Sequence, residues 1–181
     1  MCWQKKKHQT GTDRIFEAYQ KLKNKDIDYV INLQGDEPLI DIEDIKNLNN
    51  HTIKKNSEIT TLACKISDKK ILNKSNIVKV ITDEEISKEN MSRANTFSRE
   101  ISLNNNLNVY HHIGIYMYKV STLEKFVNLK QSKNEMDQNL EQLRAIDNNF
   151  EINVILANSS PIGIDTEEDF MEIKKIMNYK N

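Results

Sequence analysis

The stretch Tyr29-Val30-Ile31-Asn32-Leu33-Gln34-Gly35-Asp36-Glu37-Pro38 constrains the fold more than any other part of the sequence. Its first half is short, apolar and rich in β-branched residues, which is typical of a strand buried in a parallel sheet. Its second half consists of turn formers and carboxylates. In open α/β sheets, ligands gather beyond the carboxyl ends of the strands, so the residues from Gln34 onward form a candidate site.

Helices and strands are predicted to alternate along the rest of the chain. Apolar residues at helical spacing indicate helices over residues 12–23, 42–49, 122–128, 135–146 and 167–177. Short apolar runs indicate strands over residues 59–66, 77–82, 109–118 and 152–156. The alternation predicts an α/β fold with a largely parallel sheet, and the absence of a visible linker predicts a single domain over residues 1–181. Thr12 or Asp13 is the expected N-cap of the first helix.

Composition excludes several classes of protein. The 26 Lys and Arg residues are balanced by 27 Asp and Glu, so the chain has no global positive field with which to hold a nucleic acid. No apolar run approaches the roughly 20 residues that span a bilayer, so we expect no membrane-embedded segment. Cys2 and Cys64 form no paired motif that would signal zinc or disulfides, which favours a reduced, cytoplasmic setting.

Two carboxylates far apart in the sequence are candidate site residues. Asp36 supplies a hard oxygen that suits magnesium (Mg2+), although spacing alone favours an ordinary turn at this position. Asp165 precedes a capping-box-like start formed by Thr166 and Asp169, which leaves Asp165 without a capping duty. Taken in isolation, Asp165 is read more readily as a solvated turn carboxylate.

Three further groups of polar residues have a structural as well as a functional interpretation. His111 and His112 fall in a predicted strand, so one ring faces each side of the sheet and only one can face a pocket. The segment Glu141-Gln142-Leu143-Arg144 could be a solvated helix face, because Glu and Arg three residues apart can pair along a helix. Ser92-Arg93, before a stretch poor in apolar residues, carries the weakest signal.

Seven short motifs nevertheless follow one another along nearly the whole chain. They are Gly11-Thr12-Asp13-Arg14, Gln34-Gly35-Asp36-Glu37-Pro38, Val78-Lys79-Val80, Ser92-Arg93, His112-Ile113-Gly114-Ile115-Tyr116, Leu140-Glu141-Gln142-Leu143-Arg144 and Gly163-Ile164-Asp165-Thr166. Each motif is weak alone, but in this order and spacing the series resembles the 3-deoxy-manno-octulosonate cytidylyltransferase (CMP-Kdo synthetase) family.

The resemblance implies a Rossmann-like nucleotidyltransferase that converts CTP and 3-deoxy-manno-octulosonate (Kdo) into CMP-Kdo and pyrophosphate for lipopolysaccharide synthesis. By this likeness Asp36 and Asp165 are the catalytic magnesium ligands, and Arg14 lies near the nucleotide. The resemblance also implies a homodimer. The residues that it places in the Kdo pocket are Gln34, Arg93, His112, Tyr116, Glu141 and Gln142.

The sequence departs from the family pattern in three places. The family opens with a strand and a Pro-Ala-Arg…Arg-Leu-Pro-Gly-Lys loop that cradles the CTP phosphates, whereas this sequence starts just before Gly11, so we expect it to lack that N-terminal nucleotide-binding segment. Gln138 stands where the family usually has Glu, and Phe97 stands where Pro normally follows the Ser-Arg pair.

Two alternatives to the active enzyme follow from these departures and from the chemistry. The first is a non-catalytic remnant that keeps the sugar pocket and the dimer surface of the family. The second is a cytidylyltransferase for a nine-carbon sugar acid, which the motifs around Gly114-Ile115-Tyr116 and Glu141-Gln142-Leu143-Arg144 disfavour.

Overall fold

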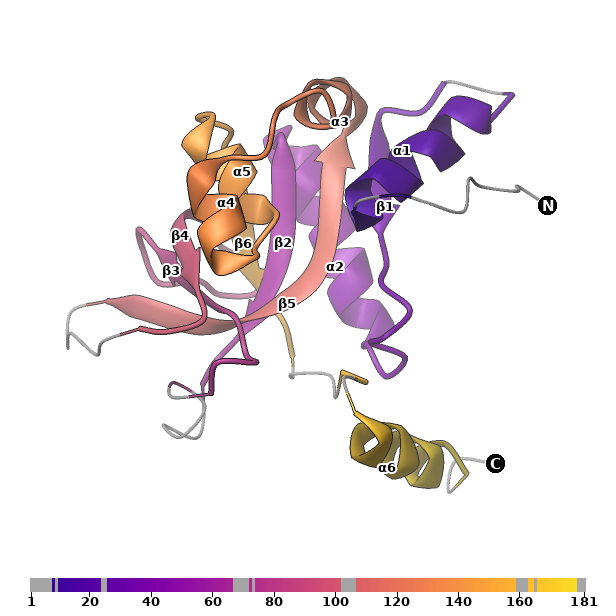
Figure 1. The fold of residues 1–181 in the computed structure, drawn as a ribbon, viewed down its shortest axis with the longest axis vertical. Helices are drawn as coiled ribbons and strands as arrows, with labels where there is room; N and C mark the ends of the chain where they lie inside the picture. The colour runs from indigo at the N-terminus through magenta and orange to yellow at the C-terminus, as the bar shows by residue number, and fades with distance from the viewer. Residues whose placement is uncertain are drawn as a thin grey trace.

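The computed structural model describes residues 8, 10–23, 26–66, 72, 74–101, 107–158, 163–164 and 166–178. Within these ranges, six strands form one sheet with helices around it, except for the helix over Glu167–Asn178, which stands apart from the sheet (Figure 1). The strands are β1 (Tyr29–Asn32), β2 (Ile59–Cys64), β3 (Lys79–Thr82), β4 (Ser92–Ser98), β5 (Asn108–Lys119) and β6 (Ile152–Leu156). The helices are α1 (Gly11–Lys21), α2 (Ile42–Lys55), α3 (Val120–Phe126), α4 (Lys133–Gln138), α5 (Gln142–Asp147) and α6 (Glu167–Asn178).

The sheet is mixed, so the α/β prediction is confirmed but the prediction of a largely parallel sheet is wrong. The strand order is β1-β5-β2-β6-β4-β3, and β5 also pairs with β3, which closes five of the strands into a ring. Of the pairings between described strands, β2–β6 alone is parallel. No helix of the described chain separates β3, β4 and β5, and short connections join antiparallel neighbours, whereas parallel ones need a longer crossover.

Three local predictions also need correction. Residues 92–98 form β4 instead of a loop, because Ser92, Ala94 and Phe97 are buried although polar residues dominate the segment. The helix predicted over residues 135–146 is two helices, separated at Asn139, whose φ of 52° lies in the left-handed region and ends α4. The N-cap of α1 is Thr10, whose hydroxyl accepts a hydrogen bond from the Asp13 amide at 3.2 Å.

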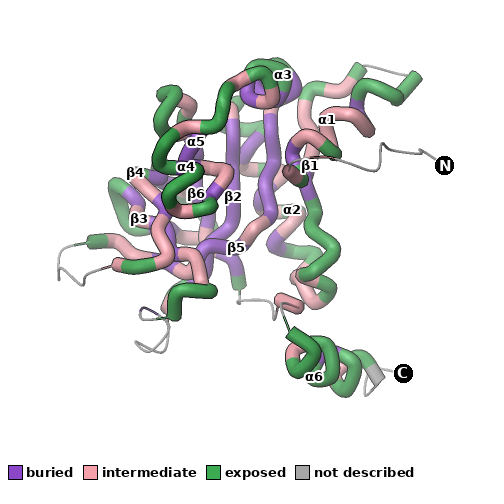
Figure 2. The backbone as a smooth tube through the Cα atoms, in the orientation of Figure 1, coloured by how far each residue is buried: buried purple, intermediate pink, exposed green. Residues whose placement is uncertain are grey.

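Apolar side chains form two core clusters, and β5 contributes to both. Ile113 and Met117 pack in a cluster with Leu48 of α2. Tyr116 and Tyr118 pack in the other cluster, which includes residues of α3 and α5. The two sets alternate because successive side chains of a strand point to opposite faces. Figure 2 shows the result: β2 and β5 are buried along most of their length, while much of the helical surface is exposed. None of the described helices is both long enough and apolar enough to span a bilayer.

Candidate active site

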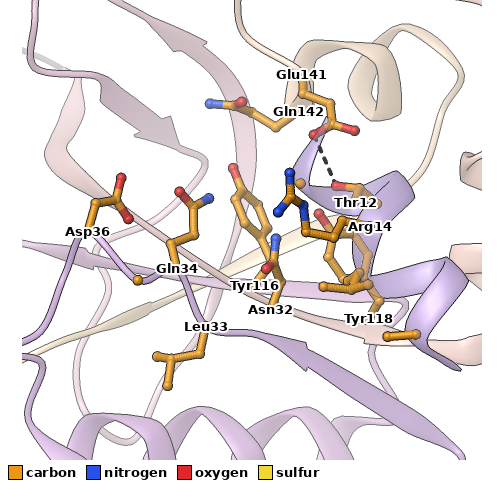
Figure 3. Close-up of a pocket in the computed structure, with 14 residues that line it drawn as sticks. Thr12, Arg14, Asn32, Leu33, Gln34, Asp36, Tyr116, Tyr118, Glu141 and Gln142 are labelled. Atoms are coloured by element: carbon orange, nitrogen blue, oxygen red, sulfur yellow. Dashed lines mark hydrogen bonds between the residues drawn. The ribbon is translucent and has the colours of Figure 1, made fainter. Parts of the chain in front are cut away.

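A cavity of about 500 Å³ opens where the loop after β1 faces the start of α1 and the start of α5 (Figure 3). Six residues predicted from the sequence line it, although they come from distant parts of the chain: Arg14, Gln34, Asp36, Tyr116, Glu141 and Gln142. The remaining lining residues are Gly11, Thr12, Ile15, Ala18, Asn32, Leu33, Gly35 and Tyr118. The volume is within the range typical of small-molecule sites, which is about 300–1,000 Å³.

An irregularity in the β2–β5 pairing anchors the loop after β1. Thr61 pairs with Tyr116 while the next residue, Leu62, pairs with Ile113, so the ladder skips Gly114 and Ile115. The Gly114 amide instead donates a hydrogen bond to Oε1 of Glu37, at 3.2 Å. The loop that carries Gln34 and Asp36 is thereby tied to the middle of the sheet. The Asp36 side chain itself stays exposed.

Glu141 is held by α1 at the edge of the cavity. Its Oε2 atom accepts a hydrogen bond from the Thr12 hydroxyl at 3.0 Å (Figure 3). Its Oε1 atom is buried and has no hydrogen-bond partner among the described residues. Burial raises the pKa of the Glu141 carboxyl, and hydrogen bonds from Thr10 and Thr12 oppose this rise. Glu141 is therefore an acceptor with one oxygen left for a ligand.

The Tyr116 hydroxyl is a second polar group that lacks a partner within the described chain. Tyr116 is only 6% exposed, and its hydroxyl points toward Gln142 and Glu141 in Figure 3. Burial raises the pKa of this phenol well above its usual value, so the hydroxyl keeps its proton and can donate. Buried polar groups almost always have partners, so two such atoms at one cavity indicate a ligand or ordered water between them.

His112 lies behind Tyr116 and is not among the residues that line the cavity. Its Nε2 atom is 3.0 Å from the Thr61 hydroxyl, and its ring meets Phe97 edge-on at a centroid distance of 5.0 Å. The Tyr116 ring is 5.4 Å away on another side. Burial lowers the pKa of His112 to about 3, so the imidazole is neutral. His112 packs against Tyr116. Direct contact between His112 and a sugar stays a prediction.

Two other predicted residues are not placed in the cavity. Arg93 is exposed on β4, between the buried residues Ser92 and Ala94, and it is not a lining residue. Asp165 lies outside the described residues. Its described neighbour Ile164 donates its backbone amide to the Asp36 carbonyl at 2.9 Å, so residues 163–164 contact the loop after β1. Roles for Arg93 and Asp165 stay predictions.

The cavity can take a magnesium ion together with a phosphate group. In the described part of the chain, no three His, Cys, Asp or Glu residues cluster into a metal cage. Magnesium does not need such a cage, because it typically uses one or two carboxylates plus substrate phosphate oxygens and water. The exposed carboxylate of Asp36 fits this mode of binding, and Arg14 lines the same cavity from α1.

Of the lining residues that were not predicted from the sequence, the polar ones Thr12, Asn32 and Tyr118 each left a signal. Thr12 belongs to the Gly11-Thr12-Asp13-Arg14 motif, but the sequence alone indicates only a helix N-cap at this position. Asn32 is a polar residue inside an apolar strand, and it is 7% exposed. Tyr118 is two residues from Tyr116 and therefore on the same face of β5.

Comparison with known proteins agrees with this geometry. A model of the cytidylyltransferase family matches residues 1–155. The chain is 40% identical over 177 residues to the 3-deoxy-manno-octulosonate cytidylyltransferase of Francisella tularensis subsp. holarctica, covering 94% of this chain and 71% of that protein. It is 38% identical over 171 residues to the Agrobacterium fabrum protein of the same name, covering 94% of this chain and 67% of that protein.

Solved structures show the same fold. A CMP:2-keto-3-deoxy-manno-octonic acid synthetase complexed with CTP superposes with a TM-score of 0.84 at 28% identity, over 96% of this chain and 70% of that one. A 4-diphosphocytidyl-2C-methyl-D-erythritol synthase from Anaerococcus prevotii superposes with a TM-score of 0.57 at 16% identity, over 94% of this chain and 68% of that one. The second similarity concerns the fold alone.

Proposed function

The chain belongs to the 3-deoxy-manno-octulosonate cytidylyltransferase family, and we propose that its cavity carries out the reaction for which that family is named. In this reaction, CTP and Kdo give CMP-Kdo and pyrophosphate. The comparisons give no support to a non-catalytic remnant. The observation that carries the proposal is the pair of unpartnered buried atoms at the cavity, Tyr116 Oη and Glu141 Oε1.

These two atoms suit the hydroxyl groups of a sugar acid. A sugar hydroxyl can donate to the carboxylate oxygen of Glu141 and accept from the phenol of Tyr116. Gln34 and Gln142 add amide groups that can do both, and they line the same cavity. A hydroxyl-rich ligand would therefore satisfy groups that cost free energy when they are buried alone. We assign these four residues to the recognition of Kdo, and we keep Arg93 as a predicted contact to the Kdo carboxylate.

Two lining residues suit the nucleotide: Arg14 on α1 and Asp36 in the loop after β1. The Arg14 guanidinium can form paired hydrogen bonds with phosphate oxygens. We assign Asp36 as a magnesium ligand, with Asp165 as the second, and the bound ion would neutralise charge on the phosphate oxygens. The residues of the chain then act by holding the two substrates in register.

The reaction is a displacement at the α-phosphorus of CTP. The anomeric oxygen of Kdo forms a bond to that phosphorus and loses its proton, while the bond from the phosphorus to the bridging oxygen breaks and pyrophosphate leaves with the electron pair. Most of the rate enhancement in phosphoryl transfer comes from positioning and from electrostatic stabilisation. The cavity supplies positioning through Glu141 and Tyr116. A homodimer and a cytoplasmic location stay predictions.

The test is pyrophosphate release by the full chain with CTP, Kdo and magnesium, together with calorimetric titration of Kdo. We expect release that depends on both substrates and stops when magnesium is chelated. A chain that binds Kdo but releases no pyrophosphate would overturn the enzyme assignment in favour of the remnant. Release that occurs equally well with a nine-carbon sugar acid would overturn the assignment of Kdo as the substrate.

A further inference from the structure

We propose that Glu135 and Arg144 form a positioning pair that holds Glu141 with one carboxylate oxygen directed to the sugar. Neither residue lines the cavity, and each is only 4% exposed. Glu135 belongs to α4 and Arg144 to α5, so the pair joins the two helices on either side of the left-handed turn at Asn139.

Both oxygens of Glu135 bind Arg144. Nε of Arg144 donates to Oε2 at 2.8 Å and Nη2 donates to Oε1 at 2.5 Å, which is the paired geometry that fixes a guanidinium in one orientation. Glu135 is itself fixed by a capping box, in which its Oε2 accepts from the Ser132 amide at 3.1 Å and its own amide donates to the Ser132 hydroxyl at 3.2 Å. Its carbonyl also accepts from the Leu140 amide, immediately before Glu141. The turn that leads to Glu141 is thus anchored at Glu135.

The guanidinium of Arg144 approaches Glu141 without forming a hydrogen bond to it. Nη2 lies 4.0 Å from Oε1 of Glu141, which is too far for a hydrogen bond but close for a charge interaction. The Phe126 ring covers another side of the guanidinium, with its centroid 5.0 Å from Cζ. Because Glu135 occupies the paired donors, Oε1 of Glu141 keeps its lone pairs for a ligand.

The charged and titratable groups that face Glu141 act in opposite directions. Asp13 on α1 and burial disfavour its ionised form, while the positive charge of Arg144 favours it. The phenols of Tyr116 and Tyr118 also face it and stay protonated, since burial raises their pKa values. Burial is the largest influence on the pKa of Glu141 and raises it, while the hydrogen bonds from Thr10 and Thr12 and the charge of Arg144 oppose this rise. Arg144 thus favours Glu141 as an acceptor, and Glu135 keeps Arg144 from binding the free oxygen of Glu141.

This inference rests on the proposed function, because it concerns the affinity for Kdo. Two changes to the pair should weaken Kdo binding in different ways. Glu135→Gln releases the guanidinium toward Glu141, so we expect the KM for Kdo to rise about tenfold at every pH, with an unchanged KM for CTP. The double variant Glu135→Gln/Arg144→Gln removes both charges and leaves no unpaired buried ion. In that variant the pKa of Glu141 should rise, so the KM for Kdo should be high at acidic pH and recover as the pH increases.

The matched control is Asn134→Ala. Asn134 donates to Oδ1 of Asp147 at 2.8 Å and so joins the same two helices at their exposed side. If the pair acted only by holding α4 against α5, Asn134→Ala would raise the KM for Kdo as well, and the double variant would share the pH profile of the unchanged protein. Either result would overturn the inference.

Kdo titration by calorimetry separates this inference from the proposed function. If the unchanged chain neither binds Kdo nor releases pyrophosphate, both fail. If it binds Kdo and the pair variants keep its affinity and pH profile, the inference alone fails. If the affinity and the melting temperature of Glu135→Gln fall together, the double variant decides through its pH profile, and an unchanged profile overturns the inference.

Discussion

The two sides of the cavity are built differently. The helix side, with Thr12, Tyr116 and Glu141, consists of largely buried groups that helices and strands hold in place. The loop side, with Asp36, is exposed and is tied to the sheet through the neighbouring Glu37. A sugar is recognised by donors and acceptors that must be in position beforehand, whereas a metal with phosphate can complete its own coordination with water. We therefore expect the helix side to determine which sugar acid binds, and the loop side to hold the magnesium ion.

The largest effect is expected on the loop side. Asp36→Asn removes the carboxylate proposed to bind magnesium but keeps the size and polarity of the side chain. We expect pyrophosphate release to fall at least about 100-fold, by analogy with the loss of one preorganised electrostatic group. Because Asp36 is exposed, the melting temperature should not change. Activity that survives in Asp36→Asn would show that the loop side has no part in the chemistry.

On the helix side, Tyr116→Phe removes one unpartnered hydroxyl and nothing else. We expect the affinity for Kdo to fall about tenfold, as for the loss of one hydrogen bond to a buried group. Stability should be unchanged or slightly higher, because no described residue loses a partner. The control is Tyr110→Phe, since the Tyr110 hydroxyl accepts from the Ile86 amide at 3.1 Å outside the cavity lining. That control should lower stability and leave Kdo affinity intact, and the reverse pattern would contradict the assignment of the two sides.

The sequence predicted the loop side of the cavity better than the helix side. Gln34 and Asp36 follow an apolar strand directly, and that local signal marks a candidate site, although the spacing alone favours an ordinary turn. The partnership of Thr12 with Glu141 spans 129 residues and depends on how α1 packs beside α5. No local pattern carries that information, so only the family resemblance placed Glu141 in the pocket.

The sheet shows the same limit. Strand positions were predicted from apolar runs, and β1, β2 and β6 were found where expected. The direction of each pairing depends on which strands meet. The long strand β5 lies between β1 and β2 because of tertiary packing, and no periodic pattern in the sequence predicts this order. Strand β4 was not predicted, because its buried positions include small residues such as Ser92 and Ala94, which give no clear apolar pattern.

A smaller effect is expected where the two sides are joined. Glu37→Ala removes the carboxylate that accepts from the Gly114 amide, so the loop bearing Asp36 loses an anchor. We expect kcat to fall about fivefold, equivalent to about 1 kcal/mol for one hydrogen bond, with the KM for Kdo little changed. Steady-state kinetics with each substrate varied in turn provides the measurement. A rise in the KM for Kdo without a fall in kcat would mean that Glu37 serves the helix side instead.

The smallest effect is expected at His112, where the pH dependence of the free energy of unfolding shows whether water reaches the ring behind Tyr116. His112 has a pKa lowered to about 3 in the folded chain, while an unfolded chain binds the proton near the ordinary value of 6.5. Below that value the unfolded state holds more protons, so the free energy of unfolding should fall as the pH decreases, with a slope that approaches about 1.4 kcal/mol per pH unit for one proton. His112→Gln removes this titration while leaving an amide that can meet the Thr61 hydroxyl. In urea unfolding at pH 7.5, 6.5 and 5.5, the free energy of unfolding of the unchanged chain should therefore decline relative to that of the variant across the acidic step. If the free energies of unfolding of the two proteins instead changed in parallel with pH, His112 would take up its proton in the folded state. Water would then have to reach the ring behind Tyr116. The helix side would not be a buried site, and the contrast between the two sides of the cavity would be lost.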